Sequence, residues 1–296
     1  MRLLTIQSLI SRFFPRLGEQ LFDMMLKRMQ NKSFNIRPEW RFEPPSNIIV
    51  SDTLIPCLEA GSIESVAGVK RILNHTEVEL EDGRSIDVDA IIWCTGYQTD
   101  FSIIDPKFDP TCRPEGWLKT SGSNNKSMFS LYYNVFSLKK PDSLAFLGNV
   151  HTAVGGFQLF DLASMAIAQV WAGKSHLPSV PEMHTAVKHH HDWLMSQAQY
   201  RYNVSPGHYD PGAWVKAMDN LAGTGVNEYL GYGWKGWLFW LKERKLCNLL
   251  MGGIWSPHIH RVFDVGKRKC WDGAPEAVQK VNENVAAMKR GKDKGA

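Results

Sequence analysis

The sequence predicts an α/β fold, and three segments carry this prediction. An apolar run ends at Trp93, an alternating pattern surrounds Asp82-Gly83, and a helical period follows Gly156. The first pattern is typical of a strand buried on both faces, the second of a β-hairpin and the third of an amphipathic helix. A chain of 296 residues that is 44% hydrophobic can bury a large core, in one or two domains.

The first predicted elements are a hairpin and a buried strand. Between Thr76 and Val88, polar and apolar residues alternate on both sides of Asp82-Gly83, a dipeptide that favours a tight hairpin turn. Residues 90–93, Ala-Ile-Ile-Trp, are apolar without alternation and therefore predict a strand covered on both faces. Gly96 follows, and it allows the backbone to turn or to approach a ligand closely.

A long helix is predicted in the middle of the chain. Gly155-Gly156 opens it, and Gly173 ends it. Its apolar residues recur at helical spacing and mark one buried face; they are Leu159, Leu162, Ala163, Ala166, Ile167, Val170 and Trp171.

Histidines are concentrated in a second predicted helix, at His184 and at residues 189–191. Histidines four residues apart share a helix face, but no cluster of carboxylates or cysteines accompanies them. We therefore expect a solvated helix and no metal site. His258 and His260 are expected on one side of a strand that enters residues 261–263, with a structural role.

Several segments, matching in order along the chain, resemble flavin-containing monooxygenases. They are Cys94-Thr-Gly-Tyr97, Ser143-Leu-Ala-Phe-Leu-Gly148, His208-Tyr-Asp-Pro, Met218-Asp-Asn-Leu-Ala222 and Cys270-Trp-Asp-Gly-Ala274. The family's usual turn reads Ala-Thr-Gly-Tyr, so Cys94 replaces one small residue by another. The resemblance covers roughly Asn35 to Met288 and implies that residues 143–148 form the last strand of the FAD-binding domain.

The resemblance is to the C-terminal portion of such an enzyme only. A complete member carries two Gly-x-Gly-x-x-Gly fingerprints that hold the phosphates of FAD and NADPH, and both are absent from this sequence. We therefore expect an N-terminally truncated chain with a partial two-dinucleotide-binding-domain fold. The expected parts are a remnant of the NADPH-binding domain with amphipathic N-terminal helices and the hairpin (1–93), the junction with the C-terminal part of the FAD-binding domain (94–180), and a helical C-terminal region with a short disordered basic tail (181–296).

The resemblance implies an FAD- and NADPH-dependent monooxygenase that acts on a small-molecule substrate. In the family a flavin hydroperoxide oxygenates a nucleophilic nitrogen or sulfur atom, and because the cofactor carries that step we assign no catalytic side chain. The residues expected at the cofactor are Thr95, Gly96, Tyr97, His151, Gly155 and Gly156. At the last two, the free N–H groups of a helix N-terminus would stabilise negative charge on the reduced flavin.

Two alternatives remain open from the sequence. A related Baeyer-Villiger or N-hydroxylating flavoprotein would share the same segments. A non-catalytic chain, truncated or degenerate, would bind a partner or nothing. The fingerprint loops supply much of the affinity for dinucleotides, so we expect the isolated chain to be inactive without its missing part.

Composition limits the partners and the compartment. The net charge of +4, from 34 basic and 30 acidic residues, is too balanced for a nucleic-acid-binding surface. The five cysteines form no Cys-x-x-Cys pair, which argues against a disulfide framework or a zinc site and favours a reducing, cytoplasmic compartment. The sequence leaves the oligomeric state and the substrate unknown.

Two apolar segments raise the question of a membrane. The first 14 residues lack a cleavage site, and the aromatic segment from Tyr229 to Trp240 is followed at once by residues 242–245, all charged. Neither reaches the approximately 20 apolar residues of a transmembrane helix. Packing within the fold is the expected role of the aromatic segment, and a peripheral contact with a membrane surface is the alternative.

Overall fold

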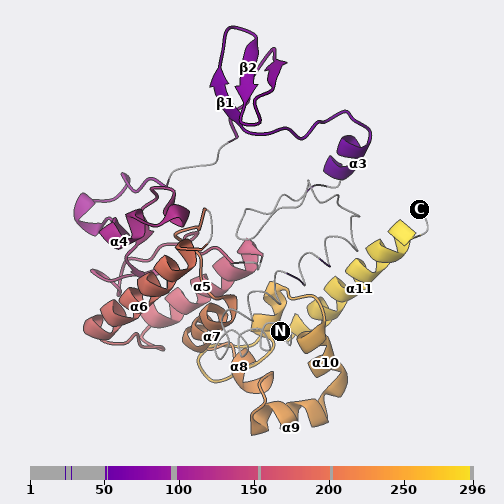
Figure 1. Ribbon diagram of the computed structural model, residues 1–296. Helices are drawn as coiled ribbons and strands as arrows, with labels where there is room; N and C mark the ends of the chain where they lie inside the picture. The colour runs from indigo at the N-terminus through magenta and orange to yellow at the C-terminus, as the bar shows by residue number, and fades with distance from the viewer. Residues whose placement is uncertain are drawn as a thin grey trace. The chain divides into compact units, whose positions relative to one another are not determined.

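The structure is a computed structural model that describes residues 24, 28, 51, 53–94, 99–152, 155–200 and 203–293 (Figure 1). The chain divides into two compact units, one of residues 21–107 and the other of residues 1–20 with 108–296. The domain boundaries expected after residues 93 and 180 stay a prediction.

In its described residues, the smaller unit contains a short helix and a three-stranded antiparallel sheet. Its elements are α3 (Leu54–Glu59), β1 (Val69–Ile72), β2 (Glu77–Leu80) and β3 (Ser85–Asp87). The strands pair in the order β1-β2-β3, with Val78 opposite Ile86. The predicted hairpin is confirmed, and Gly83 takes a φ of +85° in its turn, a conformation that glycine adopts without strain.

The buried strand predicted at residues 90–93 is not formed. In the described chain β3 ends at Asp87, and residues 90–94 have no regular structure. Ile92 is 85% exposed and Trp93 is 64% exposed. An apolar run becomes a buried strand only where neighbouring strands and covering layers are present, and neither accompanies this run in the described part of the unit.

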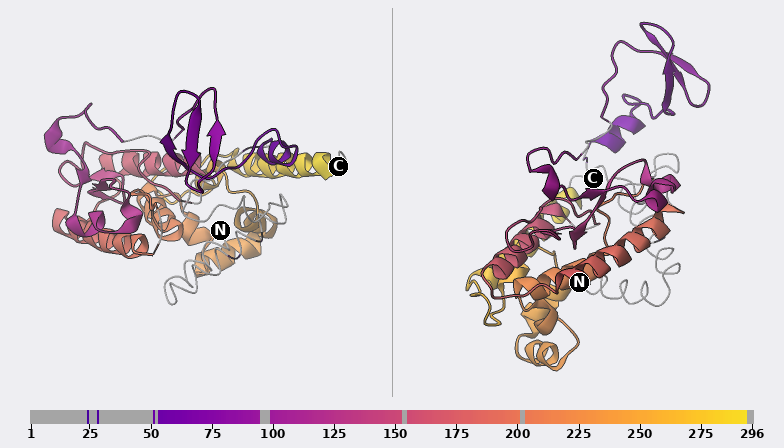
Figure 2. Two further views of the ribbon diagram at one scale, coloured as in Figure 1. Left: turned by 45° about the horizontal axis from the view of Figure 1, so that its top comes forward. Right: turned by 90° about the vertical axis from the view of Figure 1, so that its left-hand side faces the viewer.

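The larger unit is mainly helical, as two further views show (Figure 2). The strands in its described residues form two separate two-stranded antiparallel sheets, β4 (Thr111–Cys112) with β5 (Met128–Phe129) and β6 (Leu131–Tyr132) with β7 (Phe136–Ser137). Its α-helices are α4 (Glu115–Leu118), α5 (Gly156–Trp171), α6 (Val180–Ala198), α7 (Pro211–Ala222), α8 (Val226–Tyr229), α9 (Trp234–Lys242), α10 (Arg244–Gly252) and α11 (Ala274–Asp293). Three short 3₁₀ turns are η2 (Pro106–Phe108, at the boundary of the two units), η3 (Ser121–Ser123) and η4 (Pro257–Arg261).

Helix α5 is the centre of the main core, and its prediction is confirmed. It begins at Gly156, and Gly173, with a φ of +69°, follows its last turn. Five residues of the predicted face are buried: Leu159, Leu162, Ala163, Ala166 and Ile167. They pack with α7, whose Trp214 and Met218 are also buried. Trp171 is exposed instead, and its indole N–H donates to the Pro141 carbonyl.

Side-chain bonds tie α5 to the C-terminal part of the unit. Arg261 in η4 donates two hydrogen bonds to the carboxylate of Asp161, at 2.6 and 2.7 Å. Gln158 donates to the backbone carbonyl of Trp255. A paired, two-bond arginine contact fixes orientation as well as distance, so the start of α5 is held at a defined angle to η4.

Two further segments differ from their predicted strand structure. Residues 143–148 form only an isolated bridge, at Ala145 with Phe136, because β7 is two residues long and offers no longer ladder. His258 and His260 lie in the 3₁₀ turn η4, where Pro257 at its start favours a helical turn over a strand.

Helix α6 holds the histidines, and it is not solvated throughout. A capping box between Ser179 and Glu182 starts the helix. His184 and His189 are exposed, as expected. His190 is half-buried and stacks on Tyr209 at 3.9 Å between ring centroids, so the expectation of a solvated helix is wrong on this face.

We expect acid to destabilise the protein through its buried histidines. Burial lowers the pKa of His190 from 6.5 to about 3, and that of His260 to about 4. The unfolded chain therefore binds more protons, so stability present above pH 6.5 is lost as the pH falls toward these values, at up to roughly 1.4 kcal/mol per pH unit for each group. Burial raises the pKa of Asp219 to about 7, which acts in the opposite direction.

Urea unfolding of His190→Phe between pH 7 and pH 5 checks this expectation. Phenylalanine keeps the stacked ring, and it removes the buried Nε2 of His190, which has no hydrogen-bond partner among the described residues. The free energy of unfolding of His190→Phe should fall less steeply with decreasing pH than that of the original chain. His184→Phe should leave this pH dependence unchanged. Equal slopes in all three would contradict the assignment.

Candidate functional site

The N-terminus of α5 has backbone N–H groups that no side chain caps. Gly155 is the N-cap residue, and the first turn contains no acidic residue. The Gln158 N–H bonds back to the Gly155 carbonyl, and the N–H groups of Gly156 and Phe157 have no acceptor among the described residues. Free N–H groups and the positive end of the helix dipole favour a negatively charged or electron-rich group here.

Neither glycine at this helix start is required by the chain around it. Gly155 has a φ of −57°, which any residue can adopt. A Cβ on Gly156 would meet only the Phe160 ring, at 3.6 Å, and one on Gly155 would meet the flexible end of Gln158 at 3.1 Å. The surface is thus open enough for a planar group to approach the backbone, which fits the predicted flavin contact.

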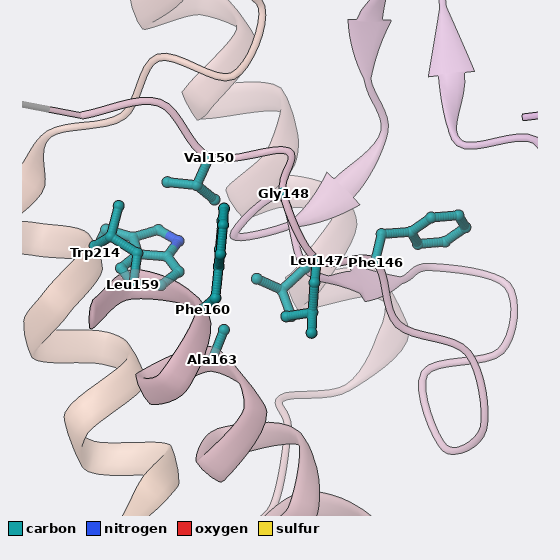
Figure 3. Close-up of a pocket in the computed structure, with 9 residues that line it drawn as sticks. Phe146, Leu147, Gly148, Val150, Leu159, Phe160, Ala163 and Trp214 are labelled. Atoms are coloured by element: carbon teal, nitrogen blue, oxygen red, sulfur yellow. The ribbon is translucent and has the colours of Figure 1, made fainter. Parts of the chain in front are cut away.

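An apolar cleft lies beside this helix start (Figure 3). Nine residues line it: Val135, Phe146, Leu147, Gly148, Val150, Leu159, Phe160, Ala163 and Trp214. Its volume is only about 10 Å³. That is far below the roughly 300 Å³ at the lower end for ligand pockets, so the cleft holds little more than one water-sized group and no dinucleotide.

His151 lies just before α5 and pairs with a distant loop. Its N–H donates to the Gly207 carbonyl at 2.8 Å, and its carbonyl accepts from the Tyr209 N–H at 3.3 Å. The Ser205 hydroxyl lies 2.5 Å from Nδ1 of His151 and also accepts from the Gly207 N–H. With Ser205 donating to Nδ1, the proton of the neutral ring is on Nε2.

The surroundings of His151 favour its neutral form. Desolvation and the positive charge of Lys126 lower the pKa of the imidazole. The Lys126 ammonium is itself held by Asn203, which accepts its hydrogen bond at 2.9 Å. The pKa of His151 thus lies below its ordinary value, which favours the neutral ring.

The loop that holds His151 is itself clamped against α6. The His208 ring stacks on Trp193, with 5.2 Å between centroids, and Tyr209 stacks on His190. Gly207 lies so close to Asn149 that a Cβ would come within 2.5 Å of the Asn149 carbonyl oxygen. The absence of a side chain at Gly207 is what lets the two backbones pair.

The structure brings only some of the predicted site residues together. His151, Gly155 and Gly156 all belong to the segment that leads into α5. Thr95, Gly96 and Tyr97 lie outside the described residues. Sequence reasoning missed Ser205 and Gly207, although both lie within three residues of the start of the His208-Tyr-Asp-Pro segment that the sequence had singled out. Within the described ranges, no group of three or more histidine, cysteine or acidic side chains is arranged to hold a metal ion.

Replacing Ser205 with alanine should raise the pKa of His151 toward its ordinary value. With the hydroxyl as the donor to Nδ1, the neutral ring is favoured, so protonation becomes easier in its absence. An NMR titration of the His151 ring protons, with nitrogen shifts to report the tautomer, measures both effects. Ser205→Thr keeps a hydroxyl and should behave like the original chain. An unchanged titration in Ser205→Ala would show that the contact does not set the state of the ring.

Comparison with known proteins identifies the family. The sequence model of the flavin-binding monooxygenase-like family matches residues 3–291, so this chain belongs to that family. The predicted resemblance is confirmed. FAD and NADPH, the predicted cofactors, are the cofactors of the family.

Individual relatives agree with the family. The chain is 40% identical over 289 residues to a monooxygenase named aurF from Gibberella zeae, covering 95% of this chain and 54% of the relative. It is 27% identical to flavin-containing monooxygenase 5 of Oryctolagus cuniculus, over 95% of this chain and 49% of the relative. It is 24% identical to a decarboxylating 4-hydroxybenzoate brominase of Pseudoalteromonas luteoviolacea, over 65% of this chain and 34% of the relative. The chain thus spans about half the length of the first two of these relatives.

Proposed function

We propose that this chain supplies the flavin-facing part of an FAD- and NADPH-dependent monooxygenase that oxygenates a nucleophilic nitrogen or sulfur atom of a small molecule. The family match over residues 3–291 carries the proposal. The bound flavin would supply the oxygen-activating chemistry. The chain's own residues would bind its ring, orient it and keep water away.

The start of α5 is the part of the chain we assign to the flavin. The uncapped N–H groups of Gly156 and Phe157 would donate to the electron-rich edge of the ring, and the helix dipole would favour the negative charge that accumulates on reduction. The apolar cleft beside the helix, lined by Leu147 and Phe160, would exclude water from one side.

His151 is assigned a neighbouring role as a neutral hydrogen-bond donor. Desolvation and the charge of Lys126 favour the neutral ring, and with Ser205 as the donor to Nδ1, Nε2–H would donate to a carbonyl of cofactor or substrate without adding a positive charge. Thr95, Gly96 and Tyr97 remain part of the proposal as the junction between the two dinucleotide-binding domains.

We also propose that the 296 residues alone retain no FAD and oxidise no NADPH. The phosphate-cradling fingerprints of the family do not occur in this sequence, and they supply much of the affinity for both dinucleotides. A reducing compartment such as the cytoplasm belongs to the proposal, since the five cysteines form no Cys-x-x-Cys pair.

The test is reconstitution. The chain is expressed alone and fused to the portion of the Gibberella zeae relative that it does not match, and each product is passed through gel filtration. We expect the fusion to retain yellow FAD and to oxidise NADPH with consumption of dioxygen, and the chain alone to be colourless. Amines, sulfides and ketones are then compared as substrates.

Three other outcomes would each lead to a different interpretation. Oxygenation of a ketone in place of an amine or sulfide would favour a Baeyer-Villiger flavoprotein. A fusion that folds and binds no FAD would favour a non-catalytic chain. Stoichiometric FAD on the chain alone would overturn the proposed dependence on the fingerprint loops.

A further inference from the structure

Helix α9, residues Trp234 to Lys242, presents an apolar face to solvent. Trp234, Trp237, Leu238 and Leu241 are 72, 57, 42 and 70% exposed. Their spacing of i, i+3, i+4 and i+7 places them on one side of a helix. We call these four residues the α9 face. Scattered exposed apolar residues are ordinary, whereas a continuous face of two tryptophans and two leucines marks a binding surface.

The opposite side of α9 is packed, so the orientation of the helix is fixed. Phe239 stands edge-on to Phe263 at 5.0 Å and to Tyr229 at 6.2 Å between ring centroids. Gly236 is buried so close to the backbone that a Cβ would collide with the Gly231 carbonyl. The α9 face therefore points outward, because the other side of the helix packs against a second hydrophobic cluster of the unit, which includes Val226 and Leu250.

Basic side chains border the α9 face. Lys235 and Lys242 are seven residues apart and lie on the same flank of the helix. Arg244 and Lys245 follow at the start of α10, both exposed. Two acidic residues lie among these four cations: Glu228, which pairs with Lys235, and Glu243. The border is thus net positive.

We propose that the α9 face inserts shallowly into an anionic lipid surface, with the helix lying in the plane of the interface. Tryptophan is enriched at the level of lipid headgroups, because its ring is apolar and its N–H polar. Lysine and arginine stems extend along apolar surface while their charges reach anionic headgroups. In the view of Figure 1, α9 lies at the lower edge of the unit, below α8.

Charge favours lipid over a second copy of the chain. Two copies meeting through the α9 face would bring their positive borders together, and like charges repel at such an interface. An anionic membrane neutralises the same border. No helix in the described part of the chain is both long and apolar enough to span a membrane, and the proposed contact needs none. The proposal is independent of the flavin site.

The experiment is co-sedimentation of the full chain with vesicles of phosphatidylcholine alone, or of phosphatidylcholine with phosphatidylserine. We expect binding to the mixed vesicles, weakened by salt, with a blue shift of tryptophan fluorescence. The double variant Trp237→Glu with Leu241→Glu should bind at least tenfold less. The matched control, Tyr200→Glu with Ile103→Glu, adds the same charge at two exposed apolar positions elsewhere and should bind like the original chain.

A second pair of variants tests the charged border. Lys242→Gln with Lys245→Gln removes two cations and keeps the α9 face; it should lower binding to the mixed vesicles by roughly fivefold for each lysine. Circular dichroism and thermal unfolding check that all variants fold. Equal binding of the two glutamate double variants, or absence of binding to anionic vesicles, would overturn the proposal. Self-association in gel filtration that Trp237→Glu abolishes, without vesicle binding, would assign the α9 face to a second copy instead.

Discussion

Replacing Gly207 with alanine should lower the free energy of unfolding by about 1 to 3 kcal/mol, because the added methyl has no space. Its carbon would lie 2.5 Å from the Asn149 carbonyl oxygen and 3.2 Å from the carbonyl carbon. These are backbone atoms, which cannot rotate away as a side chain would. The pairing between Gly207 and His151 must open, and with it the contact that Ser205 makes with the His151 ring.

Urea unfolding and hydrogen exchange at the His151 amide measure this effect. The amide is bonded to the Gly207 carbonyl in the folded chain, so its protection should fall more than that of amides in α7. Gly252→Ala is the matched control, since Gly252 ends α10 with nothing within 4 Å of an added Cβ, and alanine favours a helix. Equal losses at the two glycines would mean that the close approach at Gly207 is relieved at little cost.

Elements held by local contacts could be predicted from the sequence. The hairpin at Asp82-Gly83 needs only a two-residue turn and alternating neighbours, and α5 needs only contacts four residues apart and one apolar face. The strand predicted at residues 90–93 is not formed, because its formation would depend on contacts that are not local. A strand depends on partners far away in the sequence, and an apolar run says nothing of whether they are present.

The candidate site likewise contains parts that could be predicted from the sequence and parts that could not. The start of α5 could be predicted, because glycines and a helical period mark it in the sequence. Ser205 could not be linked to His151 beforehand, because 54 residues separate them and a serine in a loop has no pattern of its own. His190 was expected to be solvated, since a ring's burial depends on the loop that covers it, here through Tyr209. The cofactor contacts expected of Thr95, Gly96 and Tyr97 stay predictions, because these residues lie outside the described chain.

In the reconstituted flavoprotein, Gly156→Asp should weaken FAD binding or slow flavin reduction by roughly tenfold to a hundredfold. The carboxylate would stand at the helix N-terminus where the reduced flavin's own negative charge is expected. Like charges brought together in a partly desolvated site cost on the order of 1 to 3 kcal/mol, at about 1.4 kcal/mol per tenfold change.

In Gly156→Asp, an effect on FAD binding can be distinguished from an effect on folding. A Cβ at Gly156 meets only the Phe160 ring at 3.6 Å, an ordinary contact, so the chain accepts a side chain there. An acidic residue in the first turn of a helix stabilises it by about 0.3 to 1 kcal/mol. Thermal stability of Gly156→Asp should therefore be unchanged or slightly raised while FAD occupancy falls.

FAD occupancy, NADPH-dependent flavin reduction and thermal unfolding are measured together in Gly156→Asp and in His189→Asp. His189 is exposed on α6, so the second variant adds the same charge away from the helix start and should leave the flavin unaffected. A loss of occupancy confined to Gly156→Asp, at unchanged stability, would locate the flavin's negative charge at the α5 N-terminus. Equal effects of the two variants, or none at Gly156, would make the glycine pair a helix-entry turn and move the flavin contact elsewhere.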